Sequence, residues 1–120
     1  SQEHRAPIIS SLTVDGSTAA DSVHLKQGKA YSALLSIDKQ SDPALIYRWE
    51  IMREVDKDVE SDGGDFEPTP EVVWQQSSAE TSSQVEFVAP DAGEYRLYAY
   101  VEDCYGSAAT ANVPILVAKK

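Results

Sequence analysis

The sequence predicts an all-β fold, an antiparallel sandwich of about seven strands with no internal disulfide. Three observations lead to this fold class. Short segments in which apolar and polar side chains alternate recur along the chain, and Gly, Pro and Asp residues separate them. No stretch shows the period of an amphipathic helix. The chain has 1 cysteine, Cys104, so packing alone must hold the strands together.

The first half of the chain predicts four strands. Each has apolar side chains at alternate positions, the pattern of a half-buried strand. An Asp-Gly-Ser turn follows the first of them, Gly28 ends the second, and a turn that contains Asp and Pro separates the third from the fourth. These strands are 6–14, 21–29, 30–37 and 44–52.

The second half predicts a long loop followed by further strands. Residues 53–71 are acidic, contain Gly and Pro, and show little strand pattern, so we expect a loop there. Pro114 lies inside the last apolar segment and predicts an edge position or a bulge, because proline cannot donate a ladder hydrogen bond. The strands are a short one at 72–74 and longer ones at 84–90, 94–103 and 109–118.

Length and charge limit the domain organisation and the partners. With 120 residues, the chain is expected to form one domain, 1–120, in which 1–6 are a flexible terminus and 53–71 the acidic loop. The formal net charge of −10 disfavours nucleic acid and anionic membrane surfaces as partners. No apolar run is long enough to insert into a membrane. We expect a monomer.

One motif refines the fold class to an immunoglobulin-like sandwich. Residues 91–97 fit the pattern D-x-G-x-Y-x-apolar, which places Tyr95 where the chain enters a central strand. Leu97 occupies the position that holds a disulfide cysteine in antibody domains, and Trp49 lies in the middle of an earlier strand, where such folds keep a core tryptophan. We therefore expect Trp49, Tyr95 and Leu97 to build the core.

These motifs also suggest a family. The run L-x-Y-x-W-x at 45–50, preceded by an Asp-rich turn and followed later by G-x-Y with Asp103 and Gly106, resembles PKD-like and other Ig-like modules of secreted bacterial proteins. It looks most like the accessory modules of carbohydrate-active enzymes. Trp49 is not followed by the run typical of PKD domains, which favours a looser Ig-like or fibronectin-like label.

Two groups of residues are candidates for ligand binding. Tyr98 and Tyr100 alternate with inward positions, so they are expected side by side on an outer sheet face. There they can bind a ligand, contact a neighbouring domain, or serve strand packing alone. Trp74, with Gln75 and Gln76 beside it, can stack on a sugar ring and read its hydroxyl groups, or Trp74 can instead pack inward.

Acidic turns provide candidate calcium ligands. Carboxylates gathered at one end of a sandwich can hold a hard cation, and a short stretch of the acidic loop partly matches the start of a calcium loop. Turn chemistry and a solvated loop explain the same residues without a metal. The candidates are Asp38, Asp42 and Asp103 in the turns, and Asp58, Glu60 and Asp62 in the loop.

The sequence predicts no enzyme. The two histidines, His4 and His24, lie near the terminus and in a short strand, and no nucleophile or phosphate-binding motif is present. The resemblance implies a non-catalytic accessory module of a secreted carbohydrate-active enzyme, either a spacer or brace or a weak glycan binder. Its partner would be a polysaccharide or the neighbouring catalytic domain of the same chain. The alternative is a cell-surface adhesion or protein-interaction module. The expected location is secreted, periplasmic or cell-surface.

Overall fold

The computed structural model describes residues 7–17, 22–38, 45–54, 71–77, 83–103 and 106–120. All the regular secondary structure in these residues is β, and they contain no helix, so none of them forms a helix that could span a membrane. The all-β prediction is confirmed. The eight strands are β1 (Ile9–Val14), β2 (Val23–Lys26), β3 (Ala30–Ile37), β4 (Ile46–Arg53), β5 (Val72–Ser77), β6 (Gln84–Val88), β7 (Gly93–Glu102) and β8 (Ala108–Ala118).

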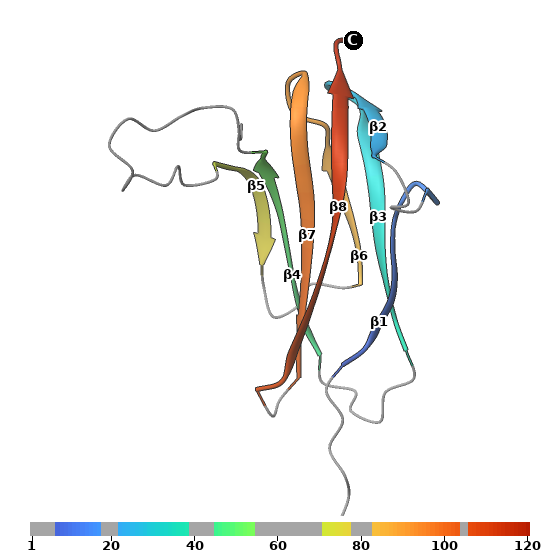
Figure 1. Ribbon diagram of the computed structural model, residues 1–120, viewed down its shortest axis with the longest axis vertical. Coiled ribbons are helices and arrows are strands. Elements are labelled where there is room, and N and C mark those ends of the chain that lie inside the picture. The colour runs from blue at the N-terminus through green and yellow to red at the C-terminus, as the bar shows by residue number, and fades with distance from the viewer. Residues whose placement is uncertain (1–6, 18–21, 39–44, 55–70, 78–82, 104–105) are drawn as a thin grey trace, which may run out of the picture.

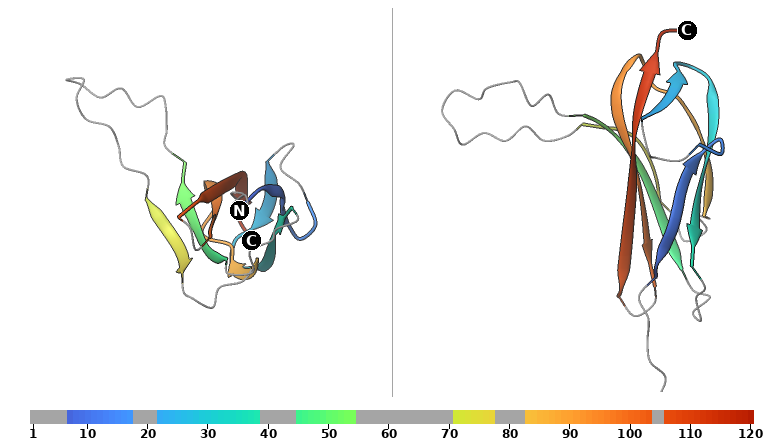
Figure 2. Two further views of the ribbon diagram at one scale, coloured as in Figure 1. Left: turned by 90° about the horizontal axis from the view of Figure 1, so that it is seen from below. Right: turned by 45° about the vertical axis from the view of Figure 1, so that its right-hand side comes forward.

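The strands form two sheets (Figure 1). One has three strands in the order β1-β3-β6, and the other has five in the order β2-β8-β7-β4-β5. Figure 2 shows them as two layers, with β4, β7 and β8 in one and β1, β3 and β6 in the other. The pairing is antiparallel except between β2 and β8, which run parallel. The expectation of a purely antiparallel sandwich is corrected at this pair.

Alternation along the strands builds the core between the layers. In β7, Tyr95, Leu97, Ala99 and Val101 are buried, whereas the residues between them are partly exposed. Opposite them on β4, Trp49 has no exposed surface. Burying apolar area is the main force that holds two such sheets together. The core cluster comprises Leu12, Val14, Val23, Leu25, Ala33, Leu35, Trp49, Ile51, Val85, Phe87, Ala89, Tyr95, Leu97, Ala99, Val101, Val113, Ile115 and Val117.

Two predicted turns have specific backbone causes. After β1, Asp15 and Gly16 adopt φ angles of 48° and 83°, and Val14 and Ser17 exchange two backbone hydrogen bonds. Positive φ at both central residues favours an Asp-Gly pair in a tight hairpin turn. Before β7, the Tyr95 hydroxyl donates a hydrogen bond of 2.6 Å to the backbone oxygen of Asp91. This bond ties the turn to the first buried residue of the strand.

Pro114 lies where β8 changes its surroundings. Residues Ala108 to Val117 of β8 pair with β7 on one side, and only from Ile115 onward does β8 also pair with β2 on its other side. The missing N–H of Pro114 therefore falls just before the ladder with β2 begins. Within the described residues, the first part of β8 is an edge and the last part is not.

The ends of the acidic loop are fastened to β4. Arg53 donates its backbone N–H to the oxygen of Glu71 at 2.8 Å, and its Nε lies 3.4 Å from Glu71 Oε2. The guanidinium carbon of Arg53 is 5.1 Å from the centre of the Tyr95 ring. The expectations for the terminus 1–6 and for most of the loop fall outside the described residues.

Candidate functional site

The outer face of β4 and β7 carries charged and aromatic side chains that contact one another. Arg48 lies opposite Tyr100, and Glu50 lies opposite Tyr98, in the register of these two strands. Because side chains alternate across a strand, these residues point away from the core. We call this surface the tyrosine face, defined by Arg48, Glu50, Arg96, Tyr98, Tyr100 and Glu102.

The two tyrosines lie side by side, in the arrangement that alternation predicts. Their ring centres are 6.3 Å apart and their planes differ by 13°. The Tyr100 hydroxyl donates a hydrogen bond of 3.2 Å to Glu50 Oε2, and the guanidinium carbon of Arg48 lies 4.4 Å from the centre of the Tyr100 ring. Tyr100 is thus held between a carboxylate and a guanidinium group.

The three described arginines of the sheet differ in their partners. Arg96 Nε contacts Glu54 Oε1 at 2.9 Å, and its Nη1 donates to Asn112 Oδ1 at 2.6 Å. Arg53 pairs with Glu71. Arg48 contacts the ring of Tyr100, and no carboxylate among the described residues pairs with it. Its N–H groups therefore remain available to a ligand.

Burial and charge set the protonation of this face. Desolvation raises the pKa of Tyr100 above its ordinary value of 10.0, the Glu50 carboxylate raises it further, and the Arg48 charge opposes the rise. The hydrogen bond to Glu54 raises the pKa of Arg96. Because both pKa values are raised, both groups keep their protons at neutral pH. Tyr100 therefore stays a neutral donor to Glu50, and Arg96 stays charged.

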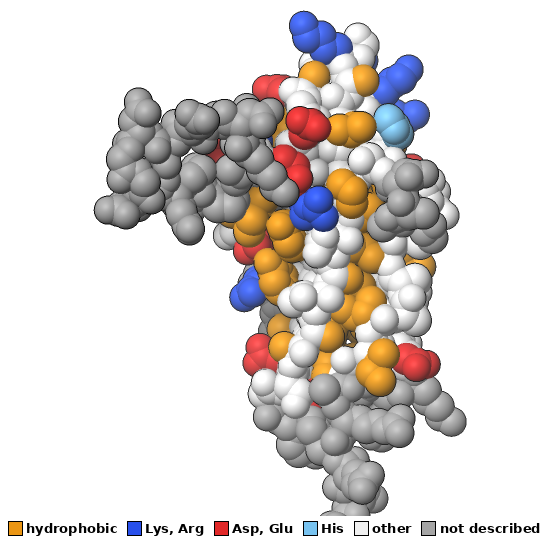
Figure 3. Space-filling model, viewed as in Figure 1, with side chains coloured by type: hydrophobic (Ala, Val, Ile, Leu, Met, Phe, Trp, Pro, Cys, Tyr) orange, Lys and Arg blue, Asp and Glu red, His pale blue; other side chains and the backbone are white. Residues whose placement is uncertain are grey.

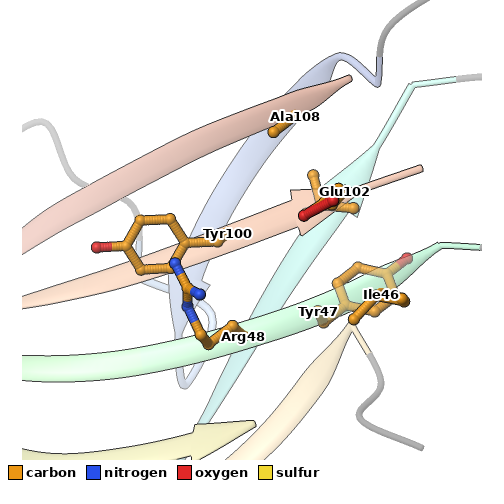
Figure 4. Close-up of a pocket in the computed structure, with 7 residues that line it drawn as sticks. Ile46, Tyr47, Arg48, Tyr100, Glu102 and Ala108 are labelled. Carbon is orange, nitrogen blue, oxygen red and sulfur yellow. The ribbon is translucent and has the colours of Figure 1, made fainter. Parts of the chain in front are cut away.

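A small pocket opens beside Arg48. Its volume is about 150 Å³, and it lies where β7 ends and where β4 and β8 begin. Figure 4 shows Arg48 against Tyr100 at one end of the pocket, and Glu102 and Ile46 toward the other. Among the described residues, no lysine belongs to the pocket lining. The lysines that the structure describes lie in β2, shortly after β2 and at the end of the chain, and Figure 3 shows basic side chains gathered at the C-terminal end of the molecule. The pocket lining is Ile46, Tyr47, Arg48, Tyr100, Val101, Glu102 and Ala108.

Trp74 lies away from the tyrosine face. It pairs with the buried Ile51 and therefore points inward, and its ring centre is 5.8 Å from that of Phe87 on the opposite sheet. Trp74 is half-buried and packs against the core. Gln75 and Gln76 are exposed on the same strand, so alternation directs them to opposite faces.

The structure describes two of the candidate calcium ligands. Asp38 and Asp103 follow the ends of β3 and β7, which lie at the same end of the molecule (Figure 1). Asp103 is buried, and its Oδ1 accepts a hydrogen bond of 2.9 Å from the backbone of Ser107. Within the described ranges, no group of three or more His, Cys, Asp or Glu side chains is placed to hold a metal ion. The remaining candidates, Asp42, Asp58, Glu60 and Asp62, lie outside the described residues.

Comparisons with known proteins give structural likenesses only. No family model matches the chain. No curated protein matches it either. Among solved structures, the chain is similar to superoxide reductase (neelaredoxin) from Ignicoccus hospitalis, with 13% sequence identity and a TM-score of 0.44, over 92% of this chain and 82% of that one. A likeness at this level assigns no activity to the chain.

The comparisons correct the functional expectations drawn from the sequence. They give no support to a PKD-like or other Ig-like module of a carbohydrate-active enzyme. The family assignment and the spacer, glycan-binding or adhesion function that it implied are therefore corrected, and the expectation of a non-enzyme is withdrawn with them. The physical reason is that the matching residues, such as Trp49, Tyr95 and Leu97, are core residues. Core and turn residues specify packing and are shared by sandwiches with unrelated functions.

Sequence reasoning missed the charged members of the tyrosine face. Arg48, Glu50 and Glu102 were visible only as the polar half of an alternating pattern, which is also the pattern of an ordinary solvent-exposed face. What distinguishes Arg48 is its position opposite Tyr100, and that depends on the register between β4 and β7. The sequence feature that could have indicated this site is the occurrence of Tyr and Arg at outward positions of two central strands.

Proposed function

We propose that the protein binds a small organic carboxylate at Arg48, in the pocket on its tyrosine face. The observation that carries this proposal is the state of the Arg48 guanidinium. It lies 4.4 Å from the centre of the Tyr100 ring and has no carboxylate partner among the described residues. Arg53 and Arg96, in the same sheet, each have one.

The chemistry of a stacked guanidinium supports a carboxylate ligand. An aromatic ring covers one flat face of the group, and its N–H donors lie in the plane at the edge. A planar carboxylate can accept two of these N–H groups at once, which a lysine ammonium cannot match in geometry. The hydrogen bond from Tyr100 to Glu50 occupies one oxygen of the acid nearest to Arg48 along β4. Glu50 therefore competes less for the guanidinium.

The size of the pocket sets the size of the ligand and its affinity. A volume of about 150 Å³ is below the roughly 300 Å³ at which drug-sized sites begin. It suits one carboxylate with a few carbon atoms, for which Ile46 and Ala108 offer apolar walls. An exposed ion pair contributes only about 1 kcal/mol or less. With about 0.8 kcal/mol added for each buried CH₂ group, we expect a dissociation constant on the order of 10 mM or weaker.

A titration with propionate tests the proposal. Backbone amide shifts of uniformly labelled protein are followed by NMR at constant ionic strength and pH 7, with sodium chloride as the reference anion. We expect saturable shifts that centre on residues 46–48, 100–102 and 108. Shifts that grow linearly, or that match those caused by chloride, would contradict the proposal.

Matched variants locate the binding group. Arg48→Gln removes one positive charge from the pocket, whereas Arg96→Gln removes the same charge from the same face but from a side chain that is paired with Glu54. We expect Arg48→Gln to weaken propionate binding roughly fivefold, the equivalent of about 1 kcal/mol, and Arg96→Gln to change it less than twofold. Equal losses in both variants would show a general charge effect instead of a site.

We also propose that the two sheets form an immunoglobulin-like sandwich. The hydrogen bond from Tyr95 to Asp91 and the buried Trp49 on β4 support this finer assignment. The strand orders β1-β3-β6 and β2-β8-β7-β4-β5 are compatible with it. Cross-strand nuclear Overhauser contacts that require a different strand order would contradict it.

A further inference from the structure

We infer that the ligand at Arg48 is a zwitterion, a small amino carboxylate whose ammonium group binds Glu102. This inference rests on the proposed carboxylate site, and it adds a binding partner for the ammonium group of the ligand. Glu102 lines the same pocket as Arg48, one outward position farther along β7 than Tyr100. The pocket thus presents a guanidinium group toward one end and a carboxylate toward the other (Figure 4).

Within the described structure, these opposite charges do not pair with each other. Glu102 lies opposite Ile46, and Arg48 lies opposite Tyr100, so the two charged residues are diagonal neighbours. Diagonal neighbours in an antiparallel pair are about 7–8 Å apart at the backbone. Arg48 is drawn toward the Tyr100 ring, and no ion pair joins it to Glu102 in the described structure. A space between two opposite charges is left for a molecule that carries both.

The surroundings of Glu102 favour an ammonium group as its partner. Glu102 is exposed and makes no ion pair with a described residue, and its direct cross-strand neighbours are the uncharged Ile46 and Ala108. An organic acid with no positive end would meet repulsion from this carboxylate. An amino carboxylate instead gains a second charge-assisted contact. Its carbon chain would lie along Ile46, whose side chain is 53% exposed.

The test compares ligands that carry a carboxylate, an ammonium group, or both. The same NMR titration is run with propionate, propylamine, glycine, β-alanine and 4-aminobutyrate, so that the spacing of the two charges varies. We expect at least one amino carboxylate to bind fivefold or more tightly than propionate, and propylamine to bind more weakly than that amino carboxylate. If no amino carboxylate binds more tightly than propionate, the inference is overturned.

Charge-matched variants assign the effect to Glu102. Glu102→Gln is expected to bring the best amino carboxylate to within twofold of propionate, and to tighten propionate binding because the repulsion from the carboxylate is removed. Glu94→Gln removes the same charge from an outward position at the other end of β7, where Glu94 lies opposite Leu116, and should change neither ligand. An equal response to both variants would reject a specific contact with Glu102.

The two proposals fail in different ways. If Arg48 is not a carboxylate site, propionate does not saturate and Arg48→Gln has no effect, which removes the proposed function and this inference together. If propionate binds through Arg48 but Glu102→Gln leaves the amino carboxylates unaffected, the proposed function stands and the zwitterion is rejected.

Discussion

The hydroxyl group of Tyr95 gives a sharp test of how the turn before β7 is stabilised. Tyr95→Phe removes one oxygen atom from a side chain that is 1% exposed, and it leaves the ring in the core. The lost interaction is the 2.6 Å hydrogen bond to the Asp91 backbone oxygen. The contact between Arg53 and the ring should survive, because phenylalanine offers the same aromatic face.

The expected cost follows from the environment of that bond. A buried neutral hydrogen bond contributes about 0.5–1.5 kcal/mol, and Asp91 is exposed enough for water to replace part of it. We therefore expect Tyr95→Phe to lower the free energy of unfolding by about 1 kcal/mol. With a urea dependence of about 2 kcal/mol per M, the unfolding midpoint falls by roughly 0.5 M.

The assay is urea unfolding followed by the fluorescence of the buried Trp49 and the half-buried Trp74. Tyr98→Phe is the matched control, because it removes a hydroxyl for which no hydrogen bond is described, and it should change stability by less than about 0.5 kcal/mol. The reasoning is refuted if Tyr95→Phe behaves like Tyr98→Phe. It is also refuted by a loss above about 3 kcal/mol, which a single hydroxyl cannot explain.

Two further predictions follow from packing and protonation. Trp74→Ala should lower the free energy of unfolding by about 1–3 kcal/mol, less than for a fully buried tryptophan, because the half-buried ring packs on Phe87; a urea midpoint no lower than that of Gln75→Ala would show that the ring adds nothing. The raised pKa of Tyr100 means that the unfolded chain loses this proton first, so this stability contribution is present below pH 10.0 and is lost as the pH rises through the raised value. Urea midpoints measured from pH 8 to pH 11 should therefore fall more steeply for the natural protein than for Tyr100→Phe, and parallel curves would disprove the shift.

The strands and their inward faces could be predicted because local alternation encodes them. The pattern in 30–37 specifies β3 to the residue, and the alternation through Tyr95 and Leu97 gives the buried face that β7 has in the structure. The same pattern places Tyr98 and Tyr100 together on the opposite face. These features depend only on the two-residue period of a strand.

Pairing between strands could not be predicted in the same way, because it depends on register and sheet order. Nothing in the sequence around residues 23–26 indicates that β2 pairs in parallel with the end of β8. The direction of the Trp74 side chain depends on its register opposite Ile51, which turns it toward Phe87. Arg48 gains its role only from its position opposite Tyr100. One-residue changes of register would move each of these side chains to the other face.

The central claim is that the Arg48 guanidinium binds a carboxylate, and its own side chain reports this most directly. Protein labelled with ¹⁵N at arginine gives a side-chain Nε–Hε resonance for each ordered arginine, and Arg48→Gln identifies the one from Arg48. On titration with propionate at pH 7, we predict a saturable shift of the Arg48 resonance while those of Arg53 and Arg96, held by Glu71 and Glu54, stay within error. An unmoved Arg48 resonance, or one that moves no more than the other two, would contradict the account.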